Sequence, residues 1–189
     1  MDAHLAVRRI VVGNLFFIGC CVFYLAWWVF CFRPVNPVKG MRTGWLLIVA
    51  AVLGLIGVVG IIRGVSGVSP AWFHNSFVVI GWVVVYVIAA IVTRQVFDRP
   101  MTSELLLFTG WAALMVAEVN ALHGSHALSV TGSVVFFVVV GVVLVIDLVC
   151  YTLYYKLASW RSYIDGMVPL VLSAVVMGTV CLVVRGALP

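Results

Sequence analysis

Polar side chains inside otherwise apolar stretches of this sequence are the first candidates for chemistry. We single out Glu118, Asn120, Asp147 and Asp165. An ionisable group in a long apolar run is costly, so it usually faces the interior of a helix bundle or a water-filled path. Asp147 is the deepest of them, and no Lys or Arg lies at a comparable depth to pair with it. We therefore expect Asp147 to be protonated or hydrated.

Two interpretations of these acids remain open. Asp147 is either a neutral acid that hydrogen-bonds to a neighbouring helix or a group on a transport path. Glu118 and Asp165 lie near the ends of their runs, where a carboxylate that faces the lipid headgroups costs little. Position alone therefore favours a structural role for these two.

An aromatic pair is the next candidate. Trp82 and Tyr86 lie well inside one apolar run and are four residues apart, so a helix places them on the same face. A tyrosine at that depth needs a hydrogen-bond partner. The tryptophans near the ends of runs are explained by an aromatic belt at the membrane surface: Trp27, Trp28, Trp72 and Trp160.

Histidine and cysteine provide few further candidates. Histidine changes charge across mildly acidic pH, so His74, His123 and His126 are candidates for sensing acid, with solvated loop histidines as the simple alternative. The HxxH at 123–126 has no carboxylate or cysteine beside it, and the five cysteines show neither metal-ligand nor CxxC spacing. We expect no metal site, no disulfide and no cofactor.

Six apolar runs must position these residues, and each is long enough to cross a bilayer, which takes about 20 residues. The chain is 65% hydrophobic and 9% charged, against about 25% charged in soluble proteins. Short connections leave no room for a soluble domain. We expect an all-α membrane protein, with residues 1–189 as a single transmembrane domain. The six runs are Ile10–Phe32, Gly44–Ile62, Ala71–Thr93, Ser103–Leu122, Val130–Tyr155 and Tyr163–Val184.

The basic residues predict an orientation. Short loops rich in Lys and Arg mark the cytoplasmic side. The loops after the first, third and fifth runs hold seven such residues: Arg33, Lys39, Arg42, Arg94, Arg99, Lys156 and Arg161. The opposite side holds four: Arg8, Arg9, Arg63 and Arg185. We expect a multi-pass protein of a plasma (inner) membrane with both termini external, which also places all four histidines, His4 included, outside. We attribute the net charge of +5 to basic residues that orient the protein in the membrane, and not to nucleic-acid binding.

The chain resembles itself at an offset of 66 residues. Arg33-Pro34 recurs as Arg99-Pro100, and Thr43-Gly44-Trp45 recurs as Thr109-Gly110-Trp111. A weaker third copy appears at an offset of 122. We interpret the pattern as three sequential helical hairpins in the same orientation, at about residues 10–64, 71–124 and 130–186. Parallel repeats of this kind are one layout of membrane transport proteins.

With these features the chain resembles the family of acid-gated urea channels and amide channels. Gly19 and Val35-Asn36-Pro37 are similar to a helical glycine and a later Val-Asp-Pro turn. Residues 81–86, Gly-Trp-Val-Val-Val-Tyr, are similar to a Gly-Phe-x-x-x-Tyr motif whose aromatics line the pore. Tyr163-Ile164-Asp165-Gly166 is similar to an aliphatic-Glu-Gly motif whose carboxylate lies near the cytoplasmic constriction.

The resemblance implies three hairpins, external termini, and external histidines that take part in acid gating. The chain also departs from the family. Val140 and Leu144, around Gly141, stand where the family has pore tryptophans, Asp replaces Glu at 165, and Asp147 has no counterpart. These differences bear on selectivity for urea more than on architecture.

The expected function is a channel for small neutral polar solutes such as urea or short amides. Trp82 and Tyr86 would line an aromatic slot and Asp165 and Glu118 would accept hydrogen bonds at its ends, with Leu144 and Asp147 also on the path. The alternative is a proton- or cation-coupled transporter in which Asp147 titrates. We expect no enzyme, because a haem or quinone site needs ligands deep in the spans, and no histidine lies there. A homo-oligomer is expected, and a role as a subunit of a larger complex stays open.

Overall fold

The described residues form α-helices and no strand. The computed structural model describes residues 3–35, 37, 43–68, 75–96 and 103–185. Within them, six segments are long and apolar enough to cross a membrane, the last of them interrupted, which confirms the expected all-helical membrane fold. The helices are α1 (Ala3–Cys31), α2 (Gly44–Val65), α3 (Asn75–Gln95), α4 (Ser103–Gly124), α5 (Val130–Leu153), α6 (Ser159–Asp165) and α7 (Val168–Arg185).

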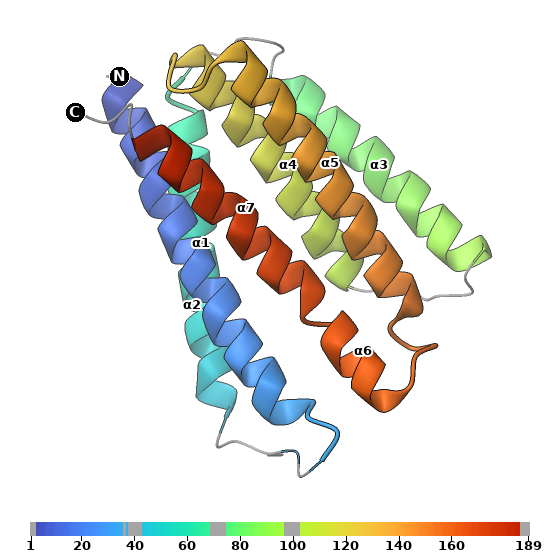
Figure 1. Ribbon diagram of the computed structural model, residues 1–189. Coiled ribbons are helices and arrows are strands. Elements are labelled where there is room, and N and C mark those ends of the chain that lie inside the picture. Colours follow the sequence, from blue (N-terminus) through green and yellow to red (C-terminus); the bar gives the residue numbers. More distant parts are fainter. Residues whose placement is uncertain (1–2, 36, 38–42, 69–74, 97–102, 186–189) are drawn as a thin grey trace.

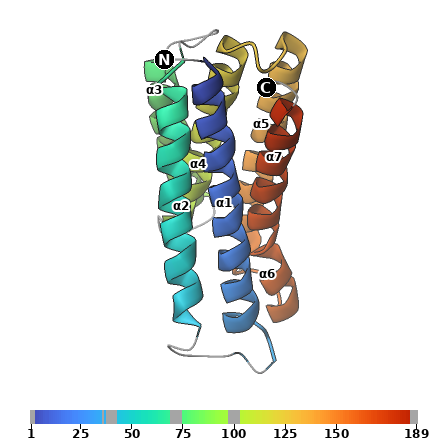
Figure 2. The same ribbon diagram turned by 90° about the vertical axis from the view of Figure 1, so that its left-hand side faces the viewer.

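The helices lie side by side in one bundle (Figures 1 and 2). α1 and α2 pack along their lengths, α7 contacts both α1 and α5, and α3 packs on α4 at the edge of the bundle. The first helix begins at the same end of the bundle as the turn between α4 and α5 and the last turn of α7 (Figure 1). Several residues of the sequence predictions lie outside the described part of the chain: His74, Asn36, Lys39, Arg42, Trp72, Arg99 and Pro100.

The last membrane segment is broken, in contrast to the uninterrupted run expected at 163–184. α6 ends at Asp165 and α7 begins at Val168. Pro169 has no N–H to donate to the carbonyl of Asp165, and its ring crowds that carbonyl. The N–H of Met167 bonds the carbonyl of Ile164, only three residues back, at 3.0 Å, and this tighter turn lies between α6 and α7.

Glycine allows α1 and α2 to touch backbone to backbone. A Cβ on Gly57 would lie 2.9 Å from the carbonyl oxygen of Gly13 and 2.9 Å from the backbone nitrogen of Phe17. A Cβ on Gly64 would lie 2.9 Å from the carbonyl oxygen of Ala6. Without a hydrophobic effect between helices in lipid, such close packing is what holds membrane helices together. Gly81 and Gly141, by contrast, are exposed, and a Cβ at either position would meet no described atom within 4 Å.

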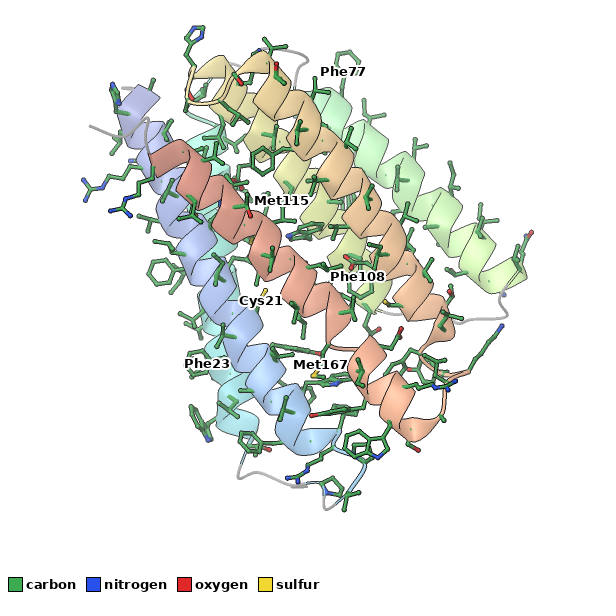
Figure 3. The ribbon with its side chains drawn as sticks, in the orientation of Figure 1. Cys21, Phe23, Phe77, Phe108, Met115 and Met167 are labelled. Carbon is green, nitrogen blue, oxygen red and sulfur yellow. The ribbon has the colours of Figure 1, made fainter. Side chains whose placement is uncertain are left out.

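The interior of the bundle is apolar and the outer surface is apolar too. A buried cluster that includes Met115, Val140, Val143 and Met177 fills the centre. Large side chains such as Phe77, which is 66% exposed, cover the outside (Figure 3). Apolar side chains are stable both in the interior and on the outer surface of a bundle in a membrane, since the lipid hydrocarbon is as apolar as the core.

The repeated sequence motifs occupy different places in their helices. Thr43 immediately precedes α2, whereas Thr109 lies in the second turn of α4. Trp45 is 55% exposed, whereas Trp111 is 6% exposed. The three-hairpin repeat therefore stays a prediction from sequence.

Candidate functional site

Glu118 and Asn14 form a buried polar pair between α4 and α1. Both side chains are fully buried, and the Asn14 amide nitrogen donates a hydrogen bond of 2.5 Å to Glu118 Oε1. Among the described residues, Glu118 Oε2 and Asn14 Oδ1 have no hydrogen-bond partner. A buried acid that leaves acceptors unused is compatible with a structural link or with a site that water or solute visits.

The Asn14–Glu118 pair can be tested by a double-mutant cycle. Asn14→Leu should lower the free energy of unfolding by about 1–3 kcal/mol, because it leaves the buried Glu118 carboxyl without its donor. Adding Glu118→Leu should recover part of that loss, since removing both partners is nearly neutral. Reversible unfolding in mixed micelles measures these energies. Strictly additive losses would show that the bond contributes no coupling.

A second polar group lies at the break between α6 and α7. Asp147 and Cys150 are three residues apart on α5, so they share a face. Cys150 also lies within hydrogen-bonding reach of Asp165. Asp147 is fully buried, and neither of its carboxylate oxygens has a partner among the described residues. The fold therefore brings together two of the acids expected from sequence.

Trp28 on α1 fixes the position of this break. Its indole N–H donates to the backbone carbonyl of Tyr163 at 3.1 Å. A Cβ on Gly166 would overlap the Trp28 ring, so glycine is needed for this close approach. The membrane-surface role expected for Trp28 from its position misses this contact, which requires knowing that α1 and α6 are neighbours.

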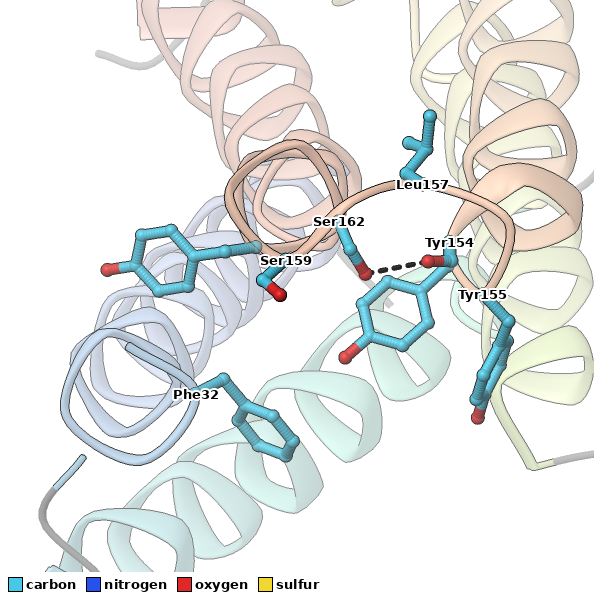
Figure 4. Close-up of a pocket in the computed structure, with 7 residues that line it drawn as sticks. Phe32, Tyr154, Tyr155, Leu157, Ser159 and Ser162 are labelled. Atoms are coloured by element: carbon cyan, nitrogen blue, oxygen red, sulfur yellow. Dashed lines mark hydrogen bonds between the residues drawn. The ribbon is translucent and has the colours of Figure 1, made fainter. Parts of the chain in front are cut away.

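A pocket of about 310 Å³ opens beside the break, at the end of the bundle where α1 and α5 finish. Figure 4 shows Phe32, Tyr154 and Tyr155 around it, with the Ser162 hydroxyl donating to the backbone carbonyl of Tyr154 at 2.6 Å. The remaining lining residues are Leu157, Ser159 and Tyr163. Ser162 and Tyr163 lie on α6, three and two residues before Asp165, so the pocket adjoins the polar group at the break.

The Asn14–Glu118 pair and the polar group around Asp147 lie at different depths in the bundle. Glu118 is six residues from the end of α4, whereas Asp147 is 17 residues from the start of α5 on the other side of the same turn. The difference is about 16 Å along the helix axis at 1.5 Å per residue. Residues at intermediate positions on these helices, such as Met115, Val140 and Val143, are buried in the apolar cluster.

The predicted aromatic pair lies at the edge of this arrangement. The Trp82 indole N–H donates to the Thr109 hydroxyl at 3.2 Å, so this side chain points at α4. Tyr86 packs on a small cluster that includes Leu105 and Tyr151. Both side chains are half-buried, and the pair contacts the α4 side of the bundle rather than the Asp165 group. Leu144 packs against the central cluster.

The described histidines gather at one end of the bundle. His4 is in the first turn of α1, and His123 and His126 belong to the end of α4 and the turn after it. One ring nitrogen of His123 lies 3.2 Å from the carbonyl oxygen of Leu128, and His126 has a φ of 60°. Among the described residues, no group of three or more His, Cys, Asp or Glu could hold a metal ion.

Sequence reasoning missed three participants, namely Asn14, Cys150 and Tyr154. The signal for Asn14 was visible, because it is an amide inside an apolar run. The cysteines show neither metal-ligand nor CxxC spacing, and Tyr154 lies at the end of an apolar run, so the sequence offered no signal for either residue. Their roles depend on which helices become neighbours.

No family model matches the chain, and no curated protein or solved structure matches it either.

Proposed function

We propose that this protein lets small neutral polar solutes, such as urea or short amides, cross a membrane. The observation that carries the proposal is the line of polar groups that leads from the aromatic and hydroxyl-lined pocket to Asp165 at the helix break, and through Cys150 to the buried Asp147. Broken helices with polar groups at the break are a recurring way to build solute sites in membrane transport proteins.

The chemistry of each part fits an uncharged solute. The rings of Phe32, Tyr154 and Tyr155 offer flat surfaces at the pocket, and the Ser159 hydroxyl can replace water around an amide group. Carboxylates then accept N–H groups further in. The buried apolar layer between Asp147 and Glu118 would form the barrier to ions, because a hydrated ion cannot shed its water there.

Several finer features belong to the same proposal. The three sequential hairpins, the external termini, the homo-oligomer and the plasma (inner) membrane location follow from the repeat, the basic residues and the resemblance to urea and amide channels. In that orientation the pocket opens to the cytoplasm, and His123 and His126 lie at the external mouth, where they could gate in acid.

A swelling assay in proteoliposomes tests the proposal. Stopped-flow light scattering would compare urea, acetamide, glycerol and potassium chloride at two external pH values, with empty liposomes as the control. We expect urea or acetamide to enter faster than in empty liposomes while the salt does not. Equal rates for all four solutes with and without protein would overturn the proposal.

Asp147 favours a second candidate, a proton-coupled transporter. A fully buried carboxylate with two unpartnered oxygens is the kind of group that proton relays use. If the protein is a passive channel, Asp147→Asn should leave flux within about twofold of the wild type, because a neutral acid and an amide are alike in size and hydrogen bonding. Loss of gradient-driven uptake in Asp147→Asn, with solute binding retained, would instead establish coupling. Uptake with and without an imposed pH gradient distinguishes the two.

The orientation has its own test. We expect cysteines introduced by His4→Cys and Leu188→Cys to react with a membrane-impermeant maleimide in intact cells, since the seven-to-four distribution of basic residues predicts external termini. The unsubstituted protein, whose five cysteines lie in or at the predicted spans, is the control for background labelling. Protection of both positions until the cells are opened would reverse the orientation.

A further inference from the structure

Three arginines line a groove between α1 and α2, far from the acids described above. The groove has a volume of about 250 Å³. We call it the arginine groove, and its residues are Leu5, Arg8, Arg9, Val12, Gly60 and Arg63. The four from α1 recur at helical spacing on one face, and the two from α2 are one turn apart. Neither the proposed transport path nor the aromatic pocket uses any of these residues.

The side chains that line the groove have the chemistry that a phosphate group requires. Among the described residues, none of the six that line it is acidic. Guanidinium groups keep their charge and present paired N–H donors that match phosphate oxygens. Arg9 makes a further interaction within the protein, so the exposed Arg8 and Arg63 are the principal contacts. A Cβ on Gly60 would lie 3.2 Å from Gly13 Cα, so this glycine lets α1 and α2 approach closely at the groove.

The surroundings of the groove favour a phospholipid over a free anion. Val12 and Gly60 lie about one helical turn nearer the middle of the membrane segment than Arg8 and Arg63, or about 4.5–6 Å. Val12 is 42% exposed, and Phe16 continues the exposed apolar surface of α1 by another turn. A headgroup phosphate at the arginines would therefore have its acyl chains along an apolar surface. Basic pockets between membrane helices bind anionic lipid headgroups in this way.

We propose that the arginine groove binds the phosphodiester of an anionic membrane phospholipid. The lipid would bridge Arg8 on α1 and Arg63 on α2 and so tie together the ends of the two most closely packed helices. This site is independent of what the protein transports.

Native mass spectrometry of the purified protein in detergent, titrated with phosphatidylglycerol or phosphatidylcholine, tests the proposal. We expect phosphatidylglycerol to bind and to raise the melting temperature, and phosphatidylcholine to do neither. Arg63→Gln should weaken phosphatidylglycerol binding by at least about tenfold, as expected for one charge-assisted contact. Arg8→Gln with Arg63→Gln should remove the site.

Arg185→Gln is the matched control, because Arg185 is an exposed arginine in the last turn of α7, at the same end of the bundle but outside the groove. It should bind phosphatidylglycerol like the wild type. If Arg185→Gln weakened phosphatidylglycerol binding as much as Arg63→Gln does, the lipid would be attracted only by the total charge of the protein. If phosphatidylcholine bound as well as phosphatidylglycerol, the site would not recognise the headgroup. Displacement of the lipid by inorganic phosphate would identify a free-anion site. Each of these three results would overturn the proposal, and the wild-type comparisons hold even if a variant does not fold.

Discussion

Asp165→Leu is expected to lower the flux of urea or acetamide by at least about tenfold. Asp165 is the last residue of α6, and its Oδ2 is buried without a partner among the described residues. Leucine removes the acceptor at the helix break and places apolar bulk there. Losing one hydrogen bond to a charged group raises a barrier by about 1.5–3 kcal/mol, and each 1.36 kcal/mol is tenfold in rate. Stopped-flow swelling at matched protein density measures the effect.

Asp165→Asn is the control for this experiment, because the amide has nearly the same shape and still accepts hydrogen bonds. It should retain part of the flux. If Asp165→Leu had the flux of the wild type, Asp165 would not lie on the transport path. Equal loss in both variants would indicate that the charge of the carboxylate, rather than its ability to accept, is required.

Gly57→Ala is expected to lower the free energy of unfolding by about 2 kcal/mol or more. The new Cβ would approach two backbone atoms of α1 at 2.9 Å, and backbone cannot turn aside as a flexible side chain can. Overpacking of this kind costs about 1–3 kcal/mol, and it would separate the two helices along their contact. Thermal or denaturant unfolding in micelles measures the loss.

Gly81→Ala is the matched control, since Gly81 lies in the second turn of α3 and its Cβ would meet no described atom within 4 Å. Alanine there should raise stability, by up to about 1 kcal/mol, because it improves helix propensity without a clash. The two variants should therefore shift the melting temperature in opposite directions. Equal shifts would show that the close contact between α1 and α2 does not limit stability.

Sequence alone determined the class of this protein. Runs of about 20 apolar residues have one stable form in lipid, the α-helix, because it satisfies every backbone polar group within the segment. The buried position of Asp147 was also predictable, since an acid in the middle of such a run is driven away from the hydrocarbon and into the bundle. These predictions need only local composition and length. The burial of Glu118 was not predictable, because an acid near the end of its run can equally face the lipid headgroups.

Only the tertiary structure decided which of these groups meet. Cys150 stands between Asp147 and Asp165 because α6 folds against α5, and Asn14 reaches Glu118 because α1 lies near α4. The positions of Gly13 and Gly57 become a contact only once α1 and α2 are side by side. Apolar periodicity in a membrane gives little information on neighbours, because the lipid-facing and protein-facing sides are equally hydrophobic. Which helices become neighbours then depends on how well their surfaces fit together and on the few polar side chains. Both are interactions between segments that lie far apart in the chain.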